Sequence, residues 1–589
     1  MYLSTLRIKD FRRLRNAELK FQRGLNVIVG ENNSGKTAIV DAILTVLNDR
    51  QSELDDVFKE GEKRSAGFSI EAFFDGMEVA DEAAFVEALV PSETPGQYRA
   101  RLSVNVTVKN QELYRTSEVG SGSKAGMYYE VLNARRVEYL PALRDPKSTT
   151  GLRAGRQSKI AGLLRRTSSE DEQKTLCGIA ETANTDMKKS PAVGRVENIV
   201  QQNIRDMSGL AFLLETDLNF VMPDFDRLAG QLEGLADGLP AVMTGLGYGN
   251  LIYIATVLGD LARGKDTEKR YRALVIEEPE AHLHPQQQIL LLRFLESQLA
   301  NNSRNIQVFV TTHSPILASQ VAMDCLLPLM DTIKRDADDQ PVVITCTKPI
   351  NVAANSENVA RIAQYLDATR SELFFAKKLI LVEGDSERML LPALFKHWRK
   401  ESLEKSGITV VSVAGLNFHW FVPFIKQGVL DIPVAILTDA DRPKRVLDNE
   451  ELSESAYVTK LKLLVDKEPN IEVYFGQKTF EYDLAAPSRN KEAILGAIER
   501  VRIKAGPRFR SESSDRVGAG FAAAFQEQFF ADKSTSKTVF AVELALLLEG
   551  GIDFEVPEHI IDAFEHVLNA KAPTPKAGTG KANGTEVPG

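Results

Sequence analysis

Cysteine and long apolar runs are both scarce in this sequence of 589 residues. Its three cysteines form no spaced pair, which argues against a disulfide framework and against a zinc site. No apolar run is long enough to span a bilayer, and the N-terminal residues lack the pattern of a signal peptide. We therefore expect a cytoplasmic protein with no membrane partner.

Net positive charge, a common mark of nucleic-acid-binding proteins, is also absent, because the formal net charge is −9. Whole-chain charge hides local patches, however, and two segments are basic: residues 135–166 and residues 500–510. A run of charge is more often a solvated face than a binding surface, so neither segment identifies DNA as a ligand by itself. The length predicts two or more domains, and the 43% hydrophobic content supports real cores.

The segment 30–37 reads G-E-N-N-S-G-K-T, which is the pattern of a phosphate-binding loop. It lies between an apolar run at 25–29 and a helical run at 37–44, the strand–loop–helix context that such a loop needs. Lys36 would reach the β- and γ-phosphates of ATP, and the Thr37 hydroxyl would bind Mg²⁺. The alternative is a tight turn before a core helix. The nucleotide-binding residues that we predict here are Gly30, Asn33, Gly35, Lys36 and Thr37.

Three later stretches follow in an informative order. A glycine-rich segment at 244–250 opens a helix, an apolar strand at 273–280 ends in paired acids, and a strand at 307–315 ends in a histidine. A buried strand that ends in carboxylates is where a nucleotide-bound Mg²⁺ and the attacking water are held. Glu278 is then the candidate general base and Glu277 the metal-side acid. The alternatives are an exposed strand end for the acids and a hydrogen-bonded core histidine. The nucleotide-site residues predicted from these stretches are Gly247, Glu277, Glu278 and His313.

The last third of the chain predicts a parallel sheet, because helical stretches separate its apolar strands. The predicted strands are 379–382, 408–413, 434–437 and 471–475. In such sheets, functional residues gather at the carboxyl ends of the strands. The acids that follow the first and third strands are Glu383, Glu387, Asp439 and Asp441. Four carboxylates at one sheet edge would repel one another unless divalent cations neutralise them, which favours Mg²⁺ or Mn²⁺.

The phosphate-binding loop, glycine-rich signature, acidic strand and switch histidine, in that order, resemble the ABC-type ATPases of the SMC-like branch. The resemblance implies head-to-head dimers in which the signature of one subunit closes over the nucleotide of the other. This signature lacks the usual serine, and Glu277 stands where Asp is usual; both fit slow turnover, with ATP acting as a switch. The mostly helical segment 150–235 is too short for a long coiled-coil arm, and we expect a helical hairpin or a dimer contact.

The E-G-x-x-x-E and D-x-D patterns of the second domain are similar to a Toprim domain. An SMC-like ATPase followed by Toprim resembles the OLD (overcoming lysogenization defect) nucleases, which include the nuclease subunit of the Gabija anti-phage system. Within that family, the segment 479–484 resembles E-Y-D-L, which implies a metal-binding role for Glu481. The segment 537–541 resembles K-x-x-F-A, which implies a role in phosphodiester cleavage for Lys537. The alternatives are a surface strand acid and a solvated helix lysine.

We therefore predict an α/β protein with three parts. Residues 1–370 form an ABC/SMC-like ATPase domain with a helical dimerisation insert at 150–235, residues 371–570 form a Toprim nuclease domain, and residues 571–589 form a disordered tail. The predicted activity is an ATP-regulated, two-metal DNA endonuclease or nickase in anti-phage defence. The alternative is a non-nucleolytic SMC-like DNA-binding clamp with a scaffolding Toprim domain. Topoisomerase activity ranks lower, because we see no domain that would present a covalent tyrosine.

The predicted partners are DNA, a second copy of the chain as a homodimer or a dimer of dimers, and a UvrD-like helicase. The predicted metal ligands are Glu383, Glu387, Asp439, Asp441, Glu481 and, at the ATP site, Thr37. The predicted catalytic residues are Glu383, Asp439, Asp441, Lys537 and Glu278.

Overall fold

The computed structural model describes most of residues 1–569. The residues outside the description are 61–62, 93, 123–130, 143–151, 209–216, 219–223, 237, 244, 264–269, 301–305, 336–340, 347–363, 368, 427–429, 431, 441–455, 467, 469, 531–534 and 570–589. Asp441 and the predicted tail at 571–589 therefore lie outside the described residues. Among the described helices, none is long and apolar enough to cross a membrane.

The chain divides into two compact units, each assembled from separate segments. The first unit contains Met1–Tyr2, Met77–Val86 and Tyr129–Val310. The second contains Leu3–Gly76, Glu87–Tyr128 and Thr311–Gly589. The domain boundaries predicted at 370 and 570 stay predictions.

Antiparallel strands open the second unit. Their order is β2-β1-β6-β8-β7, with β9 also paired to β8. Buried and partly exposed residues alternate along much of β6, which is the pattern of a strand with one face in the core. The strands are β1 (Tyr2–Phe11), β2 (Leu14–Lys20), β6 (Gly67–Asp75), β7 (Leu89–Pro91), β8 (Tyr98–Lys109) and β9 (Glu112–Val119).

The phosphate-binding loop of the second unit leaves a strand that is buried throughout, β3 (Leu25–Val29). It leads into α1 (Lys36–Leu47), which buries ten of its twelve residues. β15 (Leu326–Pro328) pairs with β3 in parallel. The sequence correctly predicts this strand–loop–helix arrangement.

The core of the first unit contains a pair of parallel strands, β10 (Arg135–Leu140) and β13 (Tyr271–Glu277). All seven residues of β13 are buried, which fits the apolar run Ala273–Ile276 before the terminal acid. The helices α8 (Leu246–Arg263) and α9 (Pro285–Ala300) flank β13 in the sequence, and the strand β14 (Ile306–Thr312) follows them.

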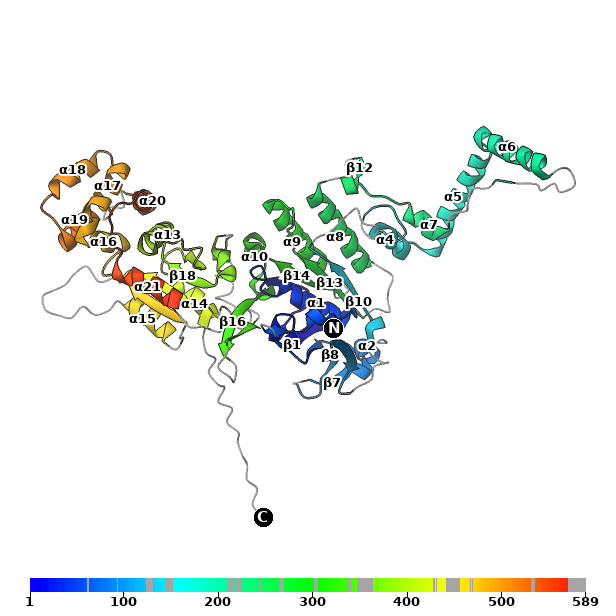
Figure 1. Ribbon diagram of the computed structural model, residues 1–589, viewed down its shortest axis with the longest axis horizontal. Coiled ribbons are helices and arrows are strands. Elements are labelled where there is room, and N and C mark those ends of the chain that lie inside the picture. The colour runs from blue at the N-terminus through cyan, green and yellow to red at the C-terminus, as the bar shows by residue number, and fades with distance from the viewer. Residues whose placement is uncertain are drawn as a thin grey trace, which may run out of the picture. The chain divides into compact units, whose positions relative to one another are not determined.

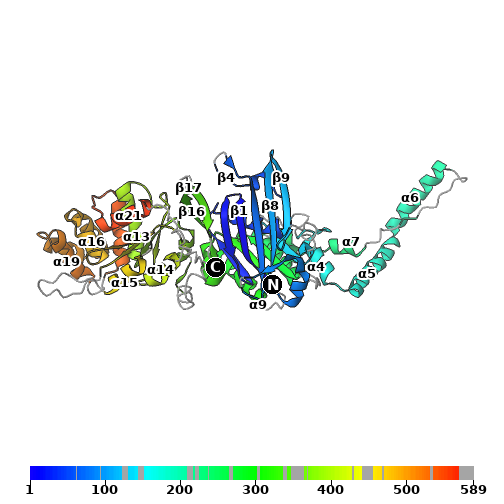
Figure 2. The same ribbon diagram turned by 90° about the horizontal axis from the view of Figure 1, so that it is seen from below.

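The segment 150–235 is mostly helical, as predicted. Its helices are α4 (Lys159–Thr167), α5 (Glu170–Lys188), α6 (Pro191–Ser208) and α7 (Phe225–Gly230). Both views show α5 starting beside α7 and leading to α6, which stands clear of the other helices of the first unit (Figures 1 and 2). None of the nineteen residues of α5 is buried. The large apolar side chains exposed on these two helices are Leu176, Ile179, Met187, Val196, Ile199 and Met207.

The last part of the second unit contains the predicted parallel sheet, with strand order β19-β18-β20-β21. The strands are β18 (Lys378–Val382), β19 (Ile408–Ser412), β20 (Val434–Thr438) and β21 (Ile471–Phe475). The helices that accompany them are α13 (Asp385–Arg399), α14 (Phe418–Lys426), α15 (Ala456–Val465) and α21 (Glu558–Asn569). A helical subdomain completes this region with α16 (Phe480–Ala485), α17 (Lys491–Val501), α18 (Ala505–Glu512), α19 (Gly518–Phe529) and α20 (Lys537–Glu549).

A single apolar core joins this sheet to the helical subdomain. It includes Ile380 of β18, Leu394 of α13, Phe525 of α19 and Phe540 of α20. Because α20 shares this core with the sheet, its first residue, Lys537, is held close enough to bond Glu481.

Candidate functional site

Parallel register brings the predicted acids of the second unit to one edge of its sheet. Val382 lies opposite Leu437, so Glu383 after β18 and Asp439 after β20 emerge side by side. One oxygen of Glu383, Oε1, accepts a hydrogen bond from the backbone N–H of Asp439 at 2.8 Å and another from the hydroxyl of Thr438. The Glu383 carboxylate is thus fixed by one oxygen, and Oε2 is left for other contacts.

Glu387 lies in the first turn of α13, close to these acids. The hydroxyl of Ser386 donates a hydrogen bond to Glu387 Oε2 at 2.9 Å. Burial raises the pKa of Glu387, and the negative charges of Glu481 and Glu383 raise it further. Glu383, Glu387 and Glu481, three of the predicted metal ligands, are therefore near enough for their negative charges to repel one another.

Asp439 is the most strongly perturbed acid of the group. Burial, followed by the charges of Glu383 and Glu481, raises its pKa to about 9, while Lys537 acts in the opposite direction. A carboxyl group in this position is protonated at neutral pH unless positive charge is supplied.

Glu481 is 1% exposed and lies on α16, so the alternative of a surface strand acid is wrong. The Lys537 ammonium donates a hydrogen bond to Glu481 Oε2 at 2.8 Å. Burial would lower the pKa of Lys537, but the charges of Glu481, Asp439 and Glu387 raise it overall. Lys537 is 48% exposed along its side chain, so it is anchored at one side and open to a ligand at the other.

The chemistry of this group fits a divalent cation. Glu481 Oε1 is buried and has no hydrogen-bond partner among the described residues. An unpartnered buried carboxylate oxygen, with acids whose pKa values are raised beside it, favours a cation that binds oxygen, such as Mg²⁺ or Mn²⁺. No set of three or more Asp, Glu, His or Cys side chains in the described part of the chain is arranged to hold a metal by itself. Asp441, the remaining predicted ligand, lies outside that part.

The phosphate-binding loop has the backbone that the sequence predicts. Asn33 (φ 66°) and Gly35 (φ 102°) are both left-handed, and Gly35 is the N-cap of α1. The Lys36 ammonium donates hydrogen bonds to the carbonyl oxygens of Gly30 and Glu31 at 2.8 and 2.7 Å. A Cβ at Gly30 would lie 2.9 Å from the Leu329 carbonyl oxygen, so this glycine is required by packing as well. Thr37 is exposed in the first turn of α1.

The acids after β13 differ from each other. Glu277 is buried, and its Oε2 accepts a hydrogen bond from the Tyr139 hydroxyl at 2.8 Å, so the exposed-end alternative is wrong for this residue. Glu278 is half-buried and has a left-handed backbone with φ 42°. Tyr139, on β10, is a contact that the sequence did not reveal.

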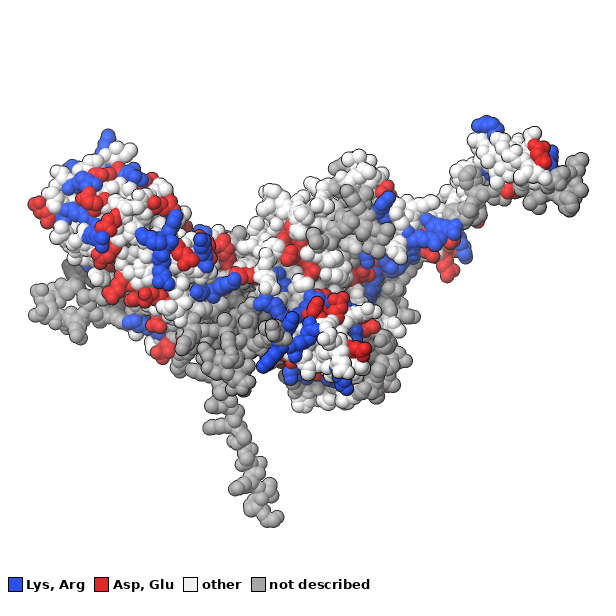
Figure 3. All heavy atoms as spheres, in the orientation of Figure 1, with Lys and Arg blue, Asp and Glu red and all other residues white. Residues whose placement is uncertain are grey.

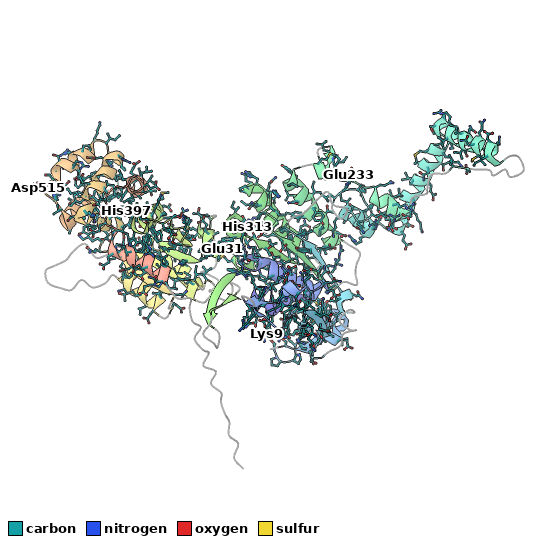
Figure 4. All side chains as sticks on the ribbon, in the orientation of Figure 1. Lys9, Glu31, Glu233, His313, His397 and Asp515 are labelled. Atoms are coloured by element: carbon teal, nitrogen blue, oxygen red, sulfur yellow. The ribbon has the colours of Figure 1, made fainter. Side chains whose placement is uncertain are left out.

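His313 is exposed directly after β14, which makes the core-histidine alternative wrong (Figure 4). The Ser314 side chain caps the next helix, α10 (Pro315–Gln320), by accepting from the Leu317 N–H at 3.3 Å. Gly247 lies in the first turn of α8, where a Cβ would come within 2.6 Å of the His282 carbonyl oxygen.

Internal ion pairs neutralise much of the basic segment 500–510. Arg510 pairs with Glu499 and Glu492, both at 2.6 Å. Arg500 and Arg508 also pair with acids of this subdomain. Acidic and basic side chains are interspersed over this region (Figure 3). These contacts favour a structural role over a DNA-binding patch.

Four residues of the segment 135–166 and one residue of α8 form a cluster that we term the α4 charge cluster. Its members are Arg136 and Glu138 of β10, Lys159 and Arg166 of α4, and Asp260 of α8. Both arginines bind the buried Asp260 carboxylate, and Lys159 binds Glu138 at 2.9 Å. These ion pairs attach α4 to β10 and α8.

Two family models match the chain. The model described as "Overcoming lysogenization defect protein-like, TOPRIM domain" matches residues 374–441. The model described as an AAA ATPase domain matches residues 1–119 and 163–318. Together they confirm the predicted combination of an ATPase and a Toprim domain.

Three curated relatives are similar to this chain. The OLD nuclease of Thermus scotoductus is 27% identical over 464 residues, which are 74% of this chain and 82% of that protein. Endonuclease GajA of Bacillus cereus is 28% identical over 257 residues, 41% of this chain and 37% of that protein. The Old nuclease of Escherichia phage P2 is 25% identical over 195 residues, 33% of this chain and 32% of that protein. The chain thus spans most of the first relative and about a third of the other two.

Proposed function

We propose that this chain, which matches the OLD-like Toprim model over residues 374–441 and the AAA ATPase model over residues 1–119 and 163–318, is an ATP-regulated, divalent-metal-dependent DNA endonuclease or nickase. The observation that carries the proposal is the Glu481 carboxylate. One of its oxygens is held by Lys537 and the other is buried without a partner among the described residues. Similarity to two proteins named as nucleases and one named as an endonuclease supports the same activity.

The residues that would hold the metals are Glu383, Glu387, Asp439, Asp441 and Glu481. A bound Mg²⁺ or Mn²⁺ supplies an activated water and neutralises charge on the phosphate. Thr438 and the Asp439 N–H orient Glu383, and Ser386 orients Glu387. The Lys537 ammonium is kept protonated by the surrounding acids, so it would offset the charge that develops on the phosphate oxygens.

ATP would bind at the phosphate-binding loop, with Lys36 on the phosphates and Thr37 on Mg²⁺. Glu278 would act as the general base for slow hydrolysis, with Glu277 on the metal side and Gly247 and His313 completing the site. ATP would then regulate DNA cleavage more than drive it. The similarity to the overcoming-lysogenization-defect family, which includes proteins of anti-phage systems, supports a role of this chain in defence against bacteriophage. The predicted UvrD-like helicase partner stays a prediction.

A homodimer is the assembly that the exposed apolar side chains of α5 and α6 support. Ile179 and Ile199 are 62% and 60% exposed, and α5 buries no residue. A second copy paired through these two helices would cover these side chains and bring two Toprim sites into one assembly.

The test is cleavage of supercoiled plasmid by the full chain with Mg²⁺ or Mn²⁺, with and without ATP. Asp439→Ala should abolish nicking and leave ATP binding and the folded structure intact. The control is Asp515→Ala, which removes an exposed acid of the same domain (Figure 4). Undiminished nicking by Asp439→Ala would contradict the proposed site, and metal-independent ATP-driven DNA binding without nicking would favour the clamp.

A further inference from the structure

The loop that carries Glu278 is held in a shape that its own sequence does not favour. Two consecutive turns follow β13, closed by Ala281 N–H to the Glu278 carbonyl at 3.1 Å and by Leu283 N–H to the Glu280 carbonyl at 2.9 Å. Glu278 and His282 have φ values of 42° and 65°. A left-handed residue other than glycine costs about 1 kcal/mol or more and persists only where the surroundings enforce it.

The N-terminal part of α8 provides that enforcement. The side-chain amide of Asn250 donates a hydrogen bond from Nδ2 to the Ala281 carbonyl at 3.2 Å. Gly247, three residues earlier, allows the His282 carbonyl to approach to a distance that any side chain would block. Positions three apart share one face of a helix, so a single face of α8 holds the Glu278 loop.

Stability alone does not explain Asn250. The residue is 2% exposed, and its Oδ1 atom is buried with no hydrogen-bond partner in the described part of the chain. Leaving a buried polar atom unsatisfied costs about 1–3 kcal/mol, whereas a neutral hydrogen bond contributes about 0.5–1.5 kcal/mol. The amide therefore costs the fold about as much as it contributes, or more, which points to a role in activity.

We infer that Asn250 is a positioning residue for ATP hydrolysis, which holds the Ala281 carbonyl and thereby sets the backbone of Glu278. The inference rests on the proposed role of Glu278 as general base. It also assigns Gly247 a function within its own subunit, in addition to any contact with a partner's nucleotide. The signature helix and the catalytic loop of one subunit would then move together.

The experiment measures ATP affinity and single-turnover hydrolysis by the full chain. Asn250→Ala should lower the hydrolysis rate about 10- to 100-fold, because a small displacement of a catalytic group has effects of this size. ATP affinity should stay unchanged, since Asn250 is not part of the phosphate-binding loop. The matched control is Asn470→Ala, which removes a similar buried amide bond, from Nδ2 to the Ile432 carbonyl at 3.0 Å, in the Toprim sheet. It should lower stability without slowing hydrolysis.

A second perturbation guards against misfolding of Asn250→Ala. Gly247→Ala would push the His282 carbonyl away and should slow hydrolysis similarly. Gly259→Ala, on the same helix with open space around it, should not. In a Glu278→Gln background, Asn250→Ala should cause no further loss of the residual rate, which a purely structural role would not predict.

The outcomes separate the proposed role of Glu278 as general base from the positioning role of Asn250. If Glu278→Gln hydrolyses ATP like the wild type, the proposed general base is wrong. If Glu278→Gln is impaired while Asn250→Ala and Gly247→Ala hydrolyse normally, the positioning role is wrong. An additive loss in the double variant would also overturn it.

Discussion

Replacement of Thr438 by valine should weaken metal binding at the Toprim site. Valine has nearly the shape of threonine but lacks the hydroxyl that donates to Glu383 Oε1. Thr438 is 6% exposed, so water has little access to replace the lost donor. Glu383 Oε1 would keep only the hydrogen bond from the Asp439 N–H at 2.8 Å, so the carboxylate that we propose as a metal ligand would be held less firmly.

The expected loss of metal affinity follows from the negative charge of the Glu383 carboxylate, which accepts the hydrogen bond. A hydrogen bond to an ionised group contributes about 1.5–3 kcal/mol, and about 1.4 kcal/mol corresponds to a tenfold change in an equilibrium constant. Loss of a residue that orients a metal ligand typically costs about 10- to 100-fold in metal affinity. We therefore expect the dissociation constant for Mn²⁺ to rise about 10- to 100-fold in Thr438→Val.

The assay is titration of the full chain with Mn²⁺, with free ion followed by electron paramagnetic resonance. Thr438→Ser keeps the hydroxyl and should bind Mn²⁺ nearly as the wild type does, and thermal unfolding without metal should be similar for both variants. Wild-type affinity in Thr438→Val, or an equal loss in Thr438→Ser, would refute the idea that the hydroxyl positions Glu383.

Three other predictions concern pH, nucleotide and assembly. The pKa of Asp439 is raised from 3.8 to about 9, so between these pH values the folded protein retains a proton that the unfolded chain releases. As the pH rises through this range without metal, the free energy of unfolding should fall and the affinity for Mn²⁺ should rise. Asp439→Asn should reduce both pH dependences, as denaturation and Mn²⁺ titration at several pH values would show. Lys36→Ala should lose ATP binding but retain nicking that ATP no longer alters, as nucleotide-binding and plasmid assays would show. The double variant Ile179→Glu, Ile199→Glu should be monomeric in light scattering of the full chain, whereas the control Thr185→Glu should stay dimeric. A wild-type chain that is monomeric in the same measurement would show that the proposed interface is wrong.

Much of the Toprim sheet could be predicted, because its signals are local. Each strand is a short apolar run between helical segments, and the acids that follow β18 and β20 reach one edge simply because the strands are parallel. Glu383 and Asp439 needed no tertiary knowledge. Glu481 could not be predicted from local signals. Only the similarity of its segment to the family identified it, and its buried position on α16 depends on packing against distant elements.

The contacts that orient these residues were beyond prediction from sequence. Thr438 and Asn250 each act on a residue from another segment, and nothing in their own neighbourhood distinguishes them from ordinary polar residues. The role of the basic segment at 500–510 also could not be read from the sequence. Its arginines pair with acids such as Glu492 and Glu543, which only the folded helices bring near.

The α4 charge cluster has a consequence for anyone who shortens this protein. Removal of residues 150–235 would delete Lys159 and Arg166 but leave Glu138 and Asp260 behind, with Arg136 as the remaining cation of the cluster. A buried carboxylate stripped of a partner typically costs about 3–5 kcal/mol, a large part of the stability of an ordinary domain. Precipitation of such a truncated chain could therefore result from these uncompensated carboxylates. A deletion that tests the insert alone would also replace Asp260 and Glu138 with neutral residues.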